Sequence, residues 1–314
     1  MKTVKVKASG CYDVKIGRGL LDTLGTELSA LASGSVLIVT DTNVAPLWLE
    51  RAEASLKAAG FTVYSAVLPA GEQSKNLENY GKLLRLLADK HLTRTDTVVA
   101  LGGGVMGDLA GFAAATYLRG LRFVQVPTTL LAMVDSSVGG KTAVDLPEGK
   151  NLAGAFHQPA LVLCDIAALD TLPEETFREG CAEVIKTAIL FDRPLFDRLA
   201  QDGLNFDRED VIARCVAHKR DIVAEDEFET GRRKLLNLGH TVGHAVEKCS
   251  GYTVTHGAAV AIGTAVMARA YCKEDREEIL AVLKKFGLPL DTQFTPQELA
   301  QAALADKKRQ GDTV

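Results

Sequence analysis

Residues 97–108 read Thr-Val-Val-Ala-Leu-Gly-Gly-Gly-Val-Met-Gly-Asp, and this stretch decides the fold. Its first five residues form a short apolar, β-branched run that is typical of a buried strand. Gly102, Gly104 and Gly107 then match the spacing G-x-G-x-x-G, and a helical pattern follows them. Glycines at this spacing let backbone N–H groups and a helix N-terminus approach a pyrophosphate. The stretch therefore predicts a strand–turn–helix unit that could bind a dinucleotide.

The glycine motif departs from the usual dinucleotide pattern in the position of its acidic residue. An acid is expected about twenty residues downstream, where this chain has Pro127. Asp41, which follows the first clear strand, lies upstream instead. Asp108 either caps the following helix or contacts the cofactor. Taken alone, the motif also fits a tight strand–helix turn that binds no ligand.

Around this motif, strand-like and helix-like segments alternate through the first half of the chain. Such alternation predicts a parallel sheet with helices on its faces. The expected strands span 35–40, 61–67, 97–101 and 122–126, and the expected helices between them span 47–60 and 77–90.

From residue 169 onward the pattern becomes helical, with no strong strand run. We therefore expect an α/β domain over 1–168 and an all-helical domain over 169–314. The last residues, Thr313 and Val314, resemble the start of a strand, so we expect the C-terminus to be truncated. The helices expected in this half span 173–190, 208–225, 243–248, 257–273 and 274–286.

The overall composition excludes several classes of protein. The 314 residues carry a net charge of −4, and 47% are hydrophobic, so the chain is globular rather than disordered. The basic residues are not clustered, which argues against a nucleic-acid partner. No apolar stretch reaches the roughly twenty residues of a membrane span, and no secretory signal begins the chain. The six cysteines form no C-x-x-C pair, so reduced thiols and a cytoplasmic location are expected.

Two short motifs carry lysines in patterns that have both a functional and an ordinary interpretation. Lys141 follows two glycines and resembles half of a Walker motif whose first glycine is absent. It could serve as a point charge for a phosphate, or it could be a solvated lysine in a turn. Glu183 and Lys186 lie three residues apart on one helical face, a spacing that is ordinarily a surface ion pair.

The histidines give a stronger signal, because three of the six fall between positions 240 and 256. His240 and His244 are four residues apart, so a helix places both on one face, and His256 precedes the next helix. Two histidines and a carboxylate with one open position form a recurring catalytic zinc site. The H-E-x-x-H glutamate of zinc proteases is missing, and buried structural histidines remain the alternative. Side chains nearby in sequence that could bind an anion are Lys219, Arg233 and Asn237.

Taken together, the motifs resemble the 3-dehydroquinate synthases, members of the sugar-phosphate cyclases. The resemblance implies a Rossmann-like NAD-binding domain, a helical zinc-binding domain, a site in the cleft between them, and a homodimer. The family continues a few dozen residues beyond Val314. The matching stretches occur in family order at 69–75, 101–108, 125–142, 179–186 and 236–244.

The resemblance also implies a role for individual residues. The metal ligands would be Glu183, His240 and His256, so His244 would belong to the substrate side. Zinc is the expected ion, and cobalt could fill the same coordination sphere. The residues that would contact substrate are Arg119, Asp135, Lys141, Asn151, Lys186, Lys219, Glu229, Arg233, Asn237, His244 and Lys307, with Lys308 as an alternative register for the last. The residues that would bind NAD are Asp41, Glu72, Lys75, Gly103, Gly104, Asp108, Thr128, Thr129, Lys141, Lys150 and Thr171.

The implied activity is that of a phosphate-eliminating carbon–oxygen lyase of the shikimate pathway. It would convert 3-deoxy-D-arabino-heptulosonate 7-phosphate to 3-dehydroquinate and phosphate, by transient oxidation with NAD, elimination, re-reduction and an intramolecular aldol closure. Three other functions compete with this one. A sister cyclase would act on another sugar phosphate, and a metal-dependent polyol dehydrogenase of the glycerol type would release NADH. A binding module without activity is the third.

Overall fold

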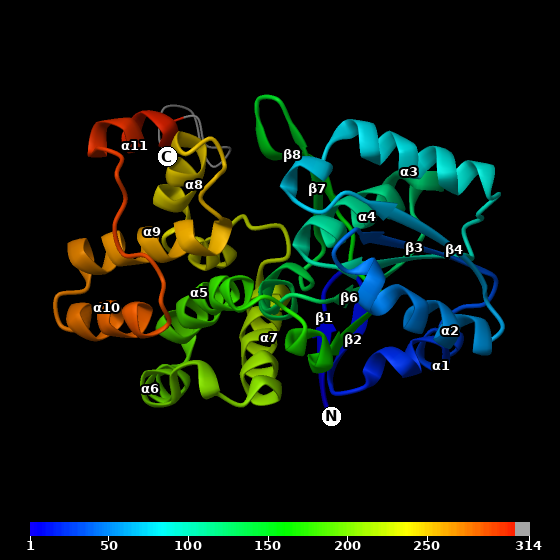
Figure 1. Ribbon diagram of the computed structural model, residues 1–314, viewed down its shortest axis with the longest axis horizontal. Coiled ribbons are helices and arrows are strands. Elements are labelled where there is room, and N and C mark those ends of the chain that lie inside the picture. Colours follow the sequence, from blue (N-terminus) through cyan, green and yellow to red (C-terminus); the bar gives the residue numbers. More distant parts are fainter. Residues whose placement is uncertain (305–314) are drawn as a thin grey trace. The chain divides into compact units, whose positions relative to one another are not determined.

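The computed structural model describes residues 1–304 and divides the chain into two compact units. The first unit comprises Met1–Leu172 and Ile212–Phe228, and the second comprises Pro173–Val211 and the chain from Glu229 onward. The first is an α/β unit with a mostly parallel sheet, and the second is helical (Figure 1). The predicted fold class is therefore confirmed.

The first unit is built on a seven-stranded sheet with the order β1-β2-β9-β6-β5-β3-β4. All neighbouring strands in it are parallel except β1 and β2, which form an antiparallel pair at one edge. Two further strands, β7 and β8, form a separate antiparallel hairpin. The strand bounds are β1 Lys2–Lys7, β2 Cys11–Gly17, β3 Ser35–Asp41, β4 Thr62–Leu68, β5 Thr97–Gly102, β6 Arg122–Pro127, β7 Lys141–Leu146, β8 Gly149–Phe156 and β9 Leu161–Asp165.

Four helices cover the two faces of this sheet. The helices α1 (Leu24–Ser29) and α2 (Glu50–Ala58) lie on one face, and α3 (Leu77–Asp89) and α4 (Gly104–Thr116) lie on the other (Figure 1). The strand order reverses at β3, which has β4 on one side and β5 on the other. In open α/β sheets, ligands bind at such a switch point, beyond the carboxyl ends of the strands. The predicted glycine turn follows β5 and so lies at this point.

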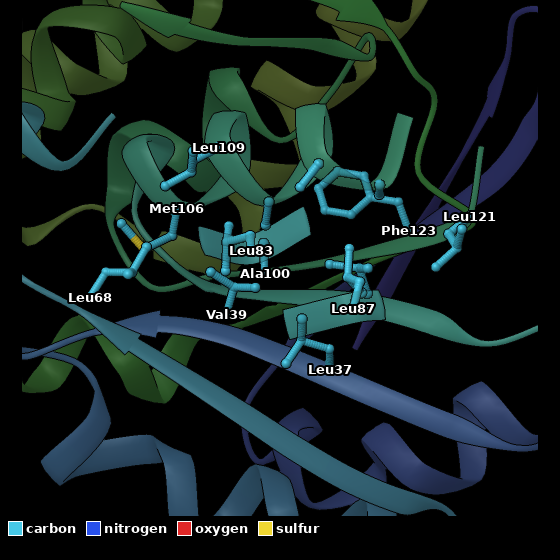
Figure 2. Close-up of a cluster of buried hydrophobic side chains, with 14 of the residues drawn as sticks. Leu37, Val39, Leu68, Leu83, Leu87, Ala100, Met106, Leu109, Leu121 and Phe123 are labelled. Carbon is cyan, nitrogen blue, oxygen red and sulfur yellow. The ribbon is translucent and has the colours of Figure 1, made fainter. Parts of the chain in front are cut away.

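Burial of apolar side chains holds α3 and α4 on the sheet. Leu83 and Leu87 of α3 are fully buried, while Tyr80 and Leu84 pack at the margin of the same cluster. Removing this apolar surface from water is the main force that stabilises the layer. The residues labelled in Figure 2 are Leu37, Val39, Leu68, Leu83, Leu87, Ala100, Met106, Leu109, Leu121 and Phe123.

The second unit is a cluster of helices, in which α9 packs against α5, α8 and α10. No helix among residues 1–304 is long and apolar enough to cross a membrane. The helix bounds are α5 Glu174–Phe191, α6 Arg193–Asp202, α7 Arg208–Glu225, α8 His240–Cys249, α9 His256–Tyr271, α10 Arg276–Lys285 and α11 Pro296–Ala303.

The helix α7 changes the expected domain boundary. We expected one continuous second domain from residue 169, but residues 212–228 belong to the first unit. Polar contacts from the middle and the end of this segment hold it to the first unit. Lys219 donates hydrogen bonds to the Asp135 carboxylate at 2.7 Å and to the Asp135 backbone carbonyl at 2.6 Å. Glu227 accepts hydrogen bonds from Ser9 and Gln158.

Candidate active site

The three expected metal ligands come together in the second unit from three different helices. Glu183 lies in α5, His240 begins α8 and His256 begins α9. The Glu183 Oε1 atom lies 3.2 Å from His256 Nε2 and 3.4 Å from His240 Nε2. The three ligand atoms lie within 4.8 Å of one another, and Glu183 is only 1% exposed. The cluster is therefore compact enough for one ion.

The hydrogen bonding of His240 leaves its Nε2 lone pair facing the cluster. Its Nδ1 lies 3.2 Å from the backbone carbonyl oxygen of Leu238, which can only accept, so Nδ1 carries the proton. Burial, with the nearby charge of Lys186, lowers the pKa of His240 to about 4, so the ring is neutral at pH 7. A neutral Nε2 cannot donate to Glu183, so a lone pair and a buried carboxylate face each other.

Lys186 keeps the Glu183 carboxylate charged inside the protein. Burial by itself raises the pKa of Glu183, but the ammonium of Lys186 and the hydrogen bond from His256 outweigh it and hold the pKa well below its usual range. Lys186 pairs with Glu183 and donates to the Leu236 carbonyl at 2.6 Å. The resulting anionic oxygen is the form that binds a divalent cation.

Glu247 is a residue of this site that the sequence analysis missed. It is 2% exposed, and its Oε2 lies 3.7 Å from Nδ1 of His256, on the side of the ring opposite Glu183. Burial lowers the pKa of His256, but Glu183 and Glu247 together raise it to about 9. The spacing of the sequence could have indicated it, because positions 240, 244 and 247 lie on one face of α8, so Glu247 shares a face with His240 and His244.

The donor set fits a divalent metal ion of the zinc type. Zinc takes His nitrogen and carboxylate oxygen at roughly 2.0–2.2 Å, so tetrahedral ligands lie ~3.3 Å from one another. The two distances from Glu183 Oε1 match this spacing. The backbone carbonyl of Leu238 and the carboxylate of Glu247 face the second ring nitrogens, as the outer partners of metal-bound histidines do.

The close approach of α9 to the turn before α8 gives a stability prediction. A Cβ on Gly263 would lie 1.9 Å from the carbonyl oxygen of Gly239, whose own φ is +76°. We expect Gly263→Ala to lower the free energy of unfolding by about 1–3 kcal/mol and to weaken metal binding, because His256 and His240 would be displaced. Urea unfolding and metal titration measure these effects.

The matched control for this change is Gly81→Ala in α3. The nearest atom to a Cβ on Gly81 is a terminal nitrogen of Arg85, 3.9 Å away. Alanine there should raise the free energy of unfolding by about 0.5–1 kcal/mol, because it restricts the unfolded chain. Equal changes in the free energy of unfolding of the two variants would contradict the close approach of Gly263 to Gly239.

In the first unit, the expected NAD residues lie at the switch point of the sheet. Asp41 ends β3, and its Oδ1 accepts hydrogen bonds from the backbone N–H groups of Asn43 and Val44. A Cβ on Gly102, at the end of β5, would lie 3.5 Å from Asp41 Oδ2. The ends of the two strands are therefore neighbours, and Asp41 stabilises the turn that follows β3.

Lys75 forms the centre of a charged cluster among these residues. Its Nζ lies 2.7 Å from Glu72 Oε1, 3.4 Å from Asp108 Oδ2 and 3.7 Å from Asp145 Oδ1. Lys150 reaches the same Glu72 oxygen at 3.9 Å. Burial lowers the pKa of Lys75, but the surrounding carboxylates outweigh it and raise that pKa. Asp145 was missed, because an acid in a short strand gave no signal.

The glycine turn and two threonines fit a dinucleotide. A Cβ on Gly103 would lie 3.2 Å from Thr129, and one on Gly104 would lie 3.0 Å from Ser136. Because neither glycine has a side chain, a ligand could approach the backbone N–H groups of this turn. The hydroxyl of Thr128 is buried without a hydrogen-bond partner among residues 1–304. A cofactor hydroxyl or phosphate would satisfy it.

Thr171 lies apart from the other expected NAD residues in its contacts. Its hydroxyl accepts a hydrogen bond from the Trp48 indole at 3.2 Å and donates to the Ala168 carbonyl at 3.0 Å.

The expected substrate residues are divided between the two units. In the first unit, Lys219 pairs with Asp135, Lys141 begins β7 and Asn151 lies in β8. Arg119 ends the short turn after α4. Each unit thus holds part of the set.

In the second unit, the amide of Asn237 donates to Glu229 Oε1 at 2.8 Å. Arg233 is 1% exposed, which is unusual for a charged side chain. The His244 ring centre lies 5.6 Å from that of His240. Lys307 and its alternative Lys308 lie outside the described residues.

Backbone strain is concentrated among the expected substrate residues. Within residues 1–304, six residues other than glycine have positive φ. Three of them are Arg119, Asn151 and Glu229, with φ of +67°, +56° and +60°. Such conformations cost of order 1–3 kcal/mol and cluster at functional sites. The Asn151 Oδ1 atom is also buried without a hydrogen-bond partner among the described residues, so a ligand hydroxyl would satisfy it.

Comparison with protein families matches almost the whole chain. Residues 65–179 match the family model of the 3-dehydroquinate synthase N-terminal domain, and residues 180–309 match that of the C-terminal domain. A 3-dehydroquinate synthase of Desulforamulus reducens is 47% identical over 98% of this chain and 90% of that protein. One from Enterococcus faecalis is 43% identical over 100% of this chain and 91% of its own length.

Solved structures show the same fold. A 2-deoxy-scyllo-inosose synthase complexed with carbaglucose-6-phosphate, NAD+ and Co2+ matches with a TM-score of 0.89 and 26% identity, over 98% of this chain and 88% of that one. A 2-epi-5-epi-valiolone synthase from Streptomyces hygroscopicus, with NAD+ and Zn2+ bound, matches with a TM-score of 0.87 and 30% identity, over 96% and 88%. The chain therefore belongs to the 3-dehydroquinate synthase family, enzymes of the shikimate pathway.

Proposed function

We propose that this chain converts 3-deoxy-D-arabino-heptulosonate 7-phosphate to 3-dehydroquinate and phosphate, as an NAD- and zinc-dependent carbon–oxygen lyase. The observation that carries the proposal is the cluster of Glu183, His240 and His256, in which the oxygen of a buried, anionic Glu183 and a lone pair of His240 face each other. Two similar synthases support the proposal, because one was solved with NAD+ and Co2+ and the other with NAD+ and Zn2+.

When bound, NAD would accept and return the electrons of a substrate alcohol, and the divalent ion would act as a Lewis acid on substrate hydroxyls. The chain's own residues bind and orient the substrate. We assign its phosphate to Lys141, Asn151, Lys186 and His244, and its carboxylate to Arg233. A proton would move from the carbon beside the oxidised alcohol to the substrate's own phosphate group, the C–O bond to that phosphate would break, and an intramolecular aldol step would then close the ring. Fixed positive charge and positioning are the main contributions of the protein.

The decisive experiment mixes the metal-loaded protein with the heptulosonate phosphate and substoichiometric NAD. We expect one phosphate released for each substrate consumed, with no accumulation of reduced nicotinamide by absorbance. A stoichiometric rise in reduced nicotinamide without phosphate release would indicate a polyol dehydrogenase instead.

A sister sugar-phosphate cyclase is the second candidate, because two cyclases with other products share the fold at TM-scores of 0.89 and 0.87. A panel of hexose and heptose phosphates separates the two functions. Faster turnover of any other sugar phosphate would replace the proposed substrate.

Removing the Lys141 ammonium should weaken catalysis strongly. A charge-assisted contact to phosphate is worth about 1.5–3 kcal/mol, so Lys141→Ala should lower kcat/KM about 10- to 150-fold. The control is Lys82→Ala, because Lys82 forms an exposed ion pair with Glu78 and a hydrogen bond to Asn79, both on its own helix, and its loss should leave kcat/KM unchanged. Equal kinetics in the two variants would remove Lys141 from the phosphate site.

The assembly and location follow from the family resemblance. We propose a homodimer in the cytoplasm. Sedimentation equilibrium measures the mass directly, and a monomer at the protein concentration of the activity assay would contradict the dimer.

A further inference from the structure

The β7–β8 hairpin carries three of the expected ligand contacts, namely Lys141, Lys150 and Asn151. It lies outside the main sheet, so something else must fix its position. Asp145 provides this link on one side. Asp145 forms a parallel bridge with Asn76, and its backbone N–H donates to the Lys75 carbonyl at 2.8 Å. These backbone contacts therefore fix the hairpin against the segment that contains Glu72 and Lys75, two expected NAD contacts.

The side chain of Asp145 extends the same link in two directions. Its Oδ1 lies 3.7 Å from Lys75 Nζ and also accepts a hydrogen bond from the backbone N–H of Asn151 at 2.8 Å. A carboxylate is a strong acceptor for such a bond. The Oδ1 atom of Asp145 therefore connects Lys75, an expected NAD contact, with Asn151, an expected substrate contact.

Two local features show that this connection holds a strained structure. The hairpin register shifts between Val144 and Leu146, so Asp145 lies at a bulge, and bulges beside active sites re-aim side chains. Asn151 has a φ of +56°, which costs energy unless its surroundings hold it. A change to negative φ would move the Asn151 side chain, so the position of that side chain depends on the hydrogen bond that its backbone N–H makes to Asp145.

We propose that Asp145 is a positioning residue that couples cofactor binding to phosphate binding. The inference rests on the proposed function, because it takes Glu72 and Lys75 as NAD contacts and Lys141 and Asn151 as phosphate contacts. NAD bound at Glu72 and Lys75 orders the segment that Asp145 is bonded to, and Asp145 then holds Asn151 in its strained, binding-competent conformation. By linkage, phosphate strengthens NAD binding by the same factor.

The test measures binding rather than turnover. Calorimetry on the metal-loaded protein gives the affinity for inorganic phosphate with and without saturating NAD, and the affinity for NAD with and without phosphate. We expect NAD to tighten phosphate binding at least about 5-fold in the unmodified protein, the lower end of typical coupling. In Asp145→Asn, each ligand should still bind alone, but the factor should fall below about 2-fold, since the charge that joins Lys75 to the Asn151 amide is lost.

The matched control is Asp96→Asn in the same unit. Asp96 is also a buried carboxylate that accepts backbone hydrogen bonds, from Ser35 at 2.6 Å and Thr93 at 2.6 Å, away from the cluster at Lys75. It should lose stability to a similar degree and keep the full coupling factor. Full coupling in Asp145→Asn, or no coupling in the unmodified protein, would overturn the proposal.

A second measurement needs no variant. Hydrogen exchange of peptides covering residues 141–156 should slow when NAD is added to the unmodified protein, because the hairpin is held more firmly. Unchanged exchange in these peptides, with NAD bound, would contradict the coupling. Failure of the proposed function has a different signature, since the protein would then release no phosphate from the heptulosonate phosphate whatever the binding data show.

Discussion

Dialysis against a metal chelator should abolish phosphate release, and added zinc should restore it. The effect follows from the arrangement of Glu183, His240 and His256, whose ligand atoms converge within 4.8 Å. A Lewis acid at this position is worth several kcal/mol of transition-state charge stabilisation, so its loss should cost about 10³-fold or more in kcat. His256→Asn should reproduce the loss and should also weaken cobalt binding in a spectroscopic titration.

The control for this variant is His91→Asn. His91 is exposed and has a φ of +56°, a conformation in which asparagine is no more strained than histidine, so the substitution adds no backbone strain. It should leave activity and cobalt binding intact. Unchanged turnover after complete removal of the metal, verified by elemental analysis, would rule out the metal role.

Local sequence patterns were sufficient for the elements that bury one continuous apolar surface. The expected strand over 97–101 and the expected helix over 77–90 agree with β5 and α3 within a residue or so. In both segments the apolar side chains are buried together only when the chain adopts that secondary structure. The edge strand β1 was missed, although Val4 and Val6 alternate with Thr3, Lys5 and Lys7, because this pattern spans only five residues. Its pairing with β2 across a three-residue turn that ends at Gly10 is a local hairpin signal that was missed as well.

The helix α7 shows a different limit of sequence reasoning. Its bounds, Arg208–Glu225, agree with the expected helix over 208–225. The part of it from Ile212 onward belongs to the first unit, where Lys219 bonds to Asp135, 84 residues away in sequence. A charged residue in a helical pattern gives no sign of a distant partner. A single boundary at residue 169 therefore could not predict that residues 212–228 belong to the first unit.

Within the candidate site, the residues that would contact ligands were easier to identify than the residues that support them. Clustered histidines at 240, 244 and 256 are rare in a chain with six, and the family resemblance added Glu183. Glu247 and Asp145 were missed because each acts through another residue, His256 or Asn151. Their importance lies in burial and distance, which exist only after folding.

Replacing Lys75 by methionine should both unfold the protein more easily and weaken NAD binding. Lys75 is 4% exposed and faces the carboxylates of Glu72, Asp108 and Asp145. Methionine keeps the length of the side chain but removes the positive charge that these three carboxylates share. Breaking a buried ion pair in this way costs about 3–5 kcal/mol, a large share of a typical folding free energy. Urea unfolding and NAD calorimetry measure the two effects.

The pH dependence of Lys75→Met separates a charge effect from a loss of packing. Without Lys75, the pKa of each neighbouring carboxyl should rise above its unfolded value, so protonation at lower pH favours the folded variant. In the unmodified protein, Lys75 and Lys150 outweigh burial and lower the pKa of Glu72, so that contribution to stability is lost as the pH falls. The stability difference should therefore narrow on acidification.

A stability difference independent of pH would instead indicate that Lys75 contributes through its apolar stem alone. The control is Lys57→Met, because Lys57 makes an exposed ion pair with Glu53 on its own helix, at 2.6 Å. Exposed pairs of this kind contribute about 0–1 kcal/mol. The contrast between the two lysines depends on burial, since the Lys75 side chain is 5% exposed, whereas that of Lys57 is 56% exposed.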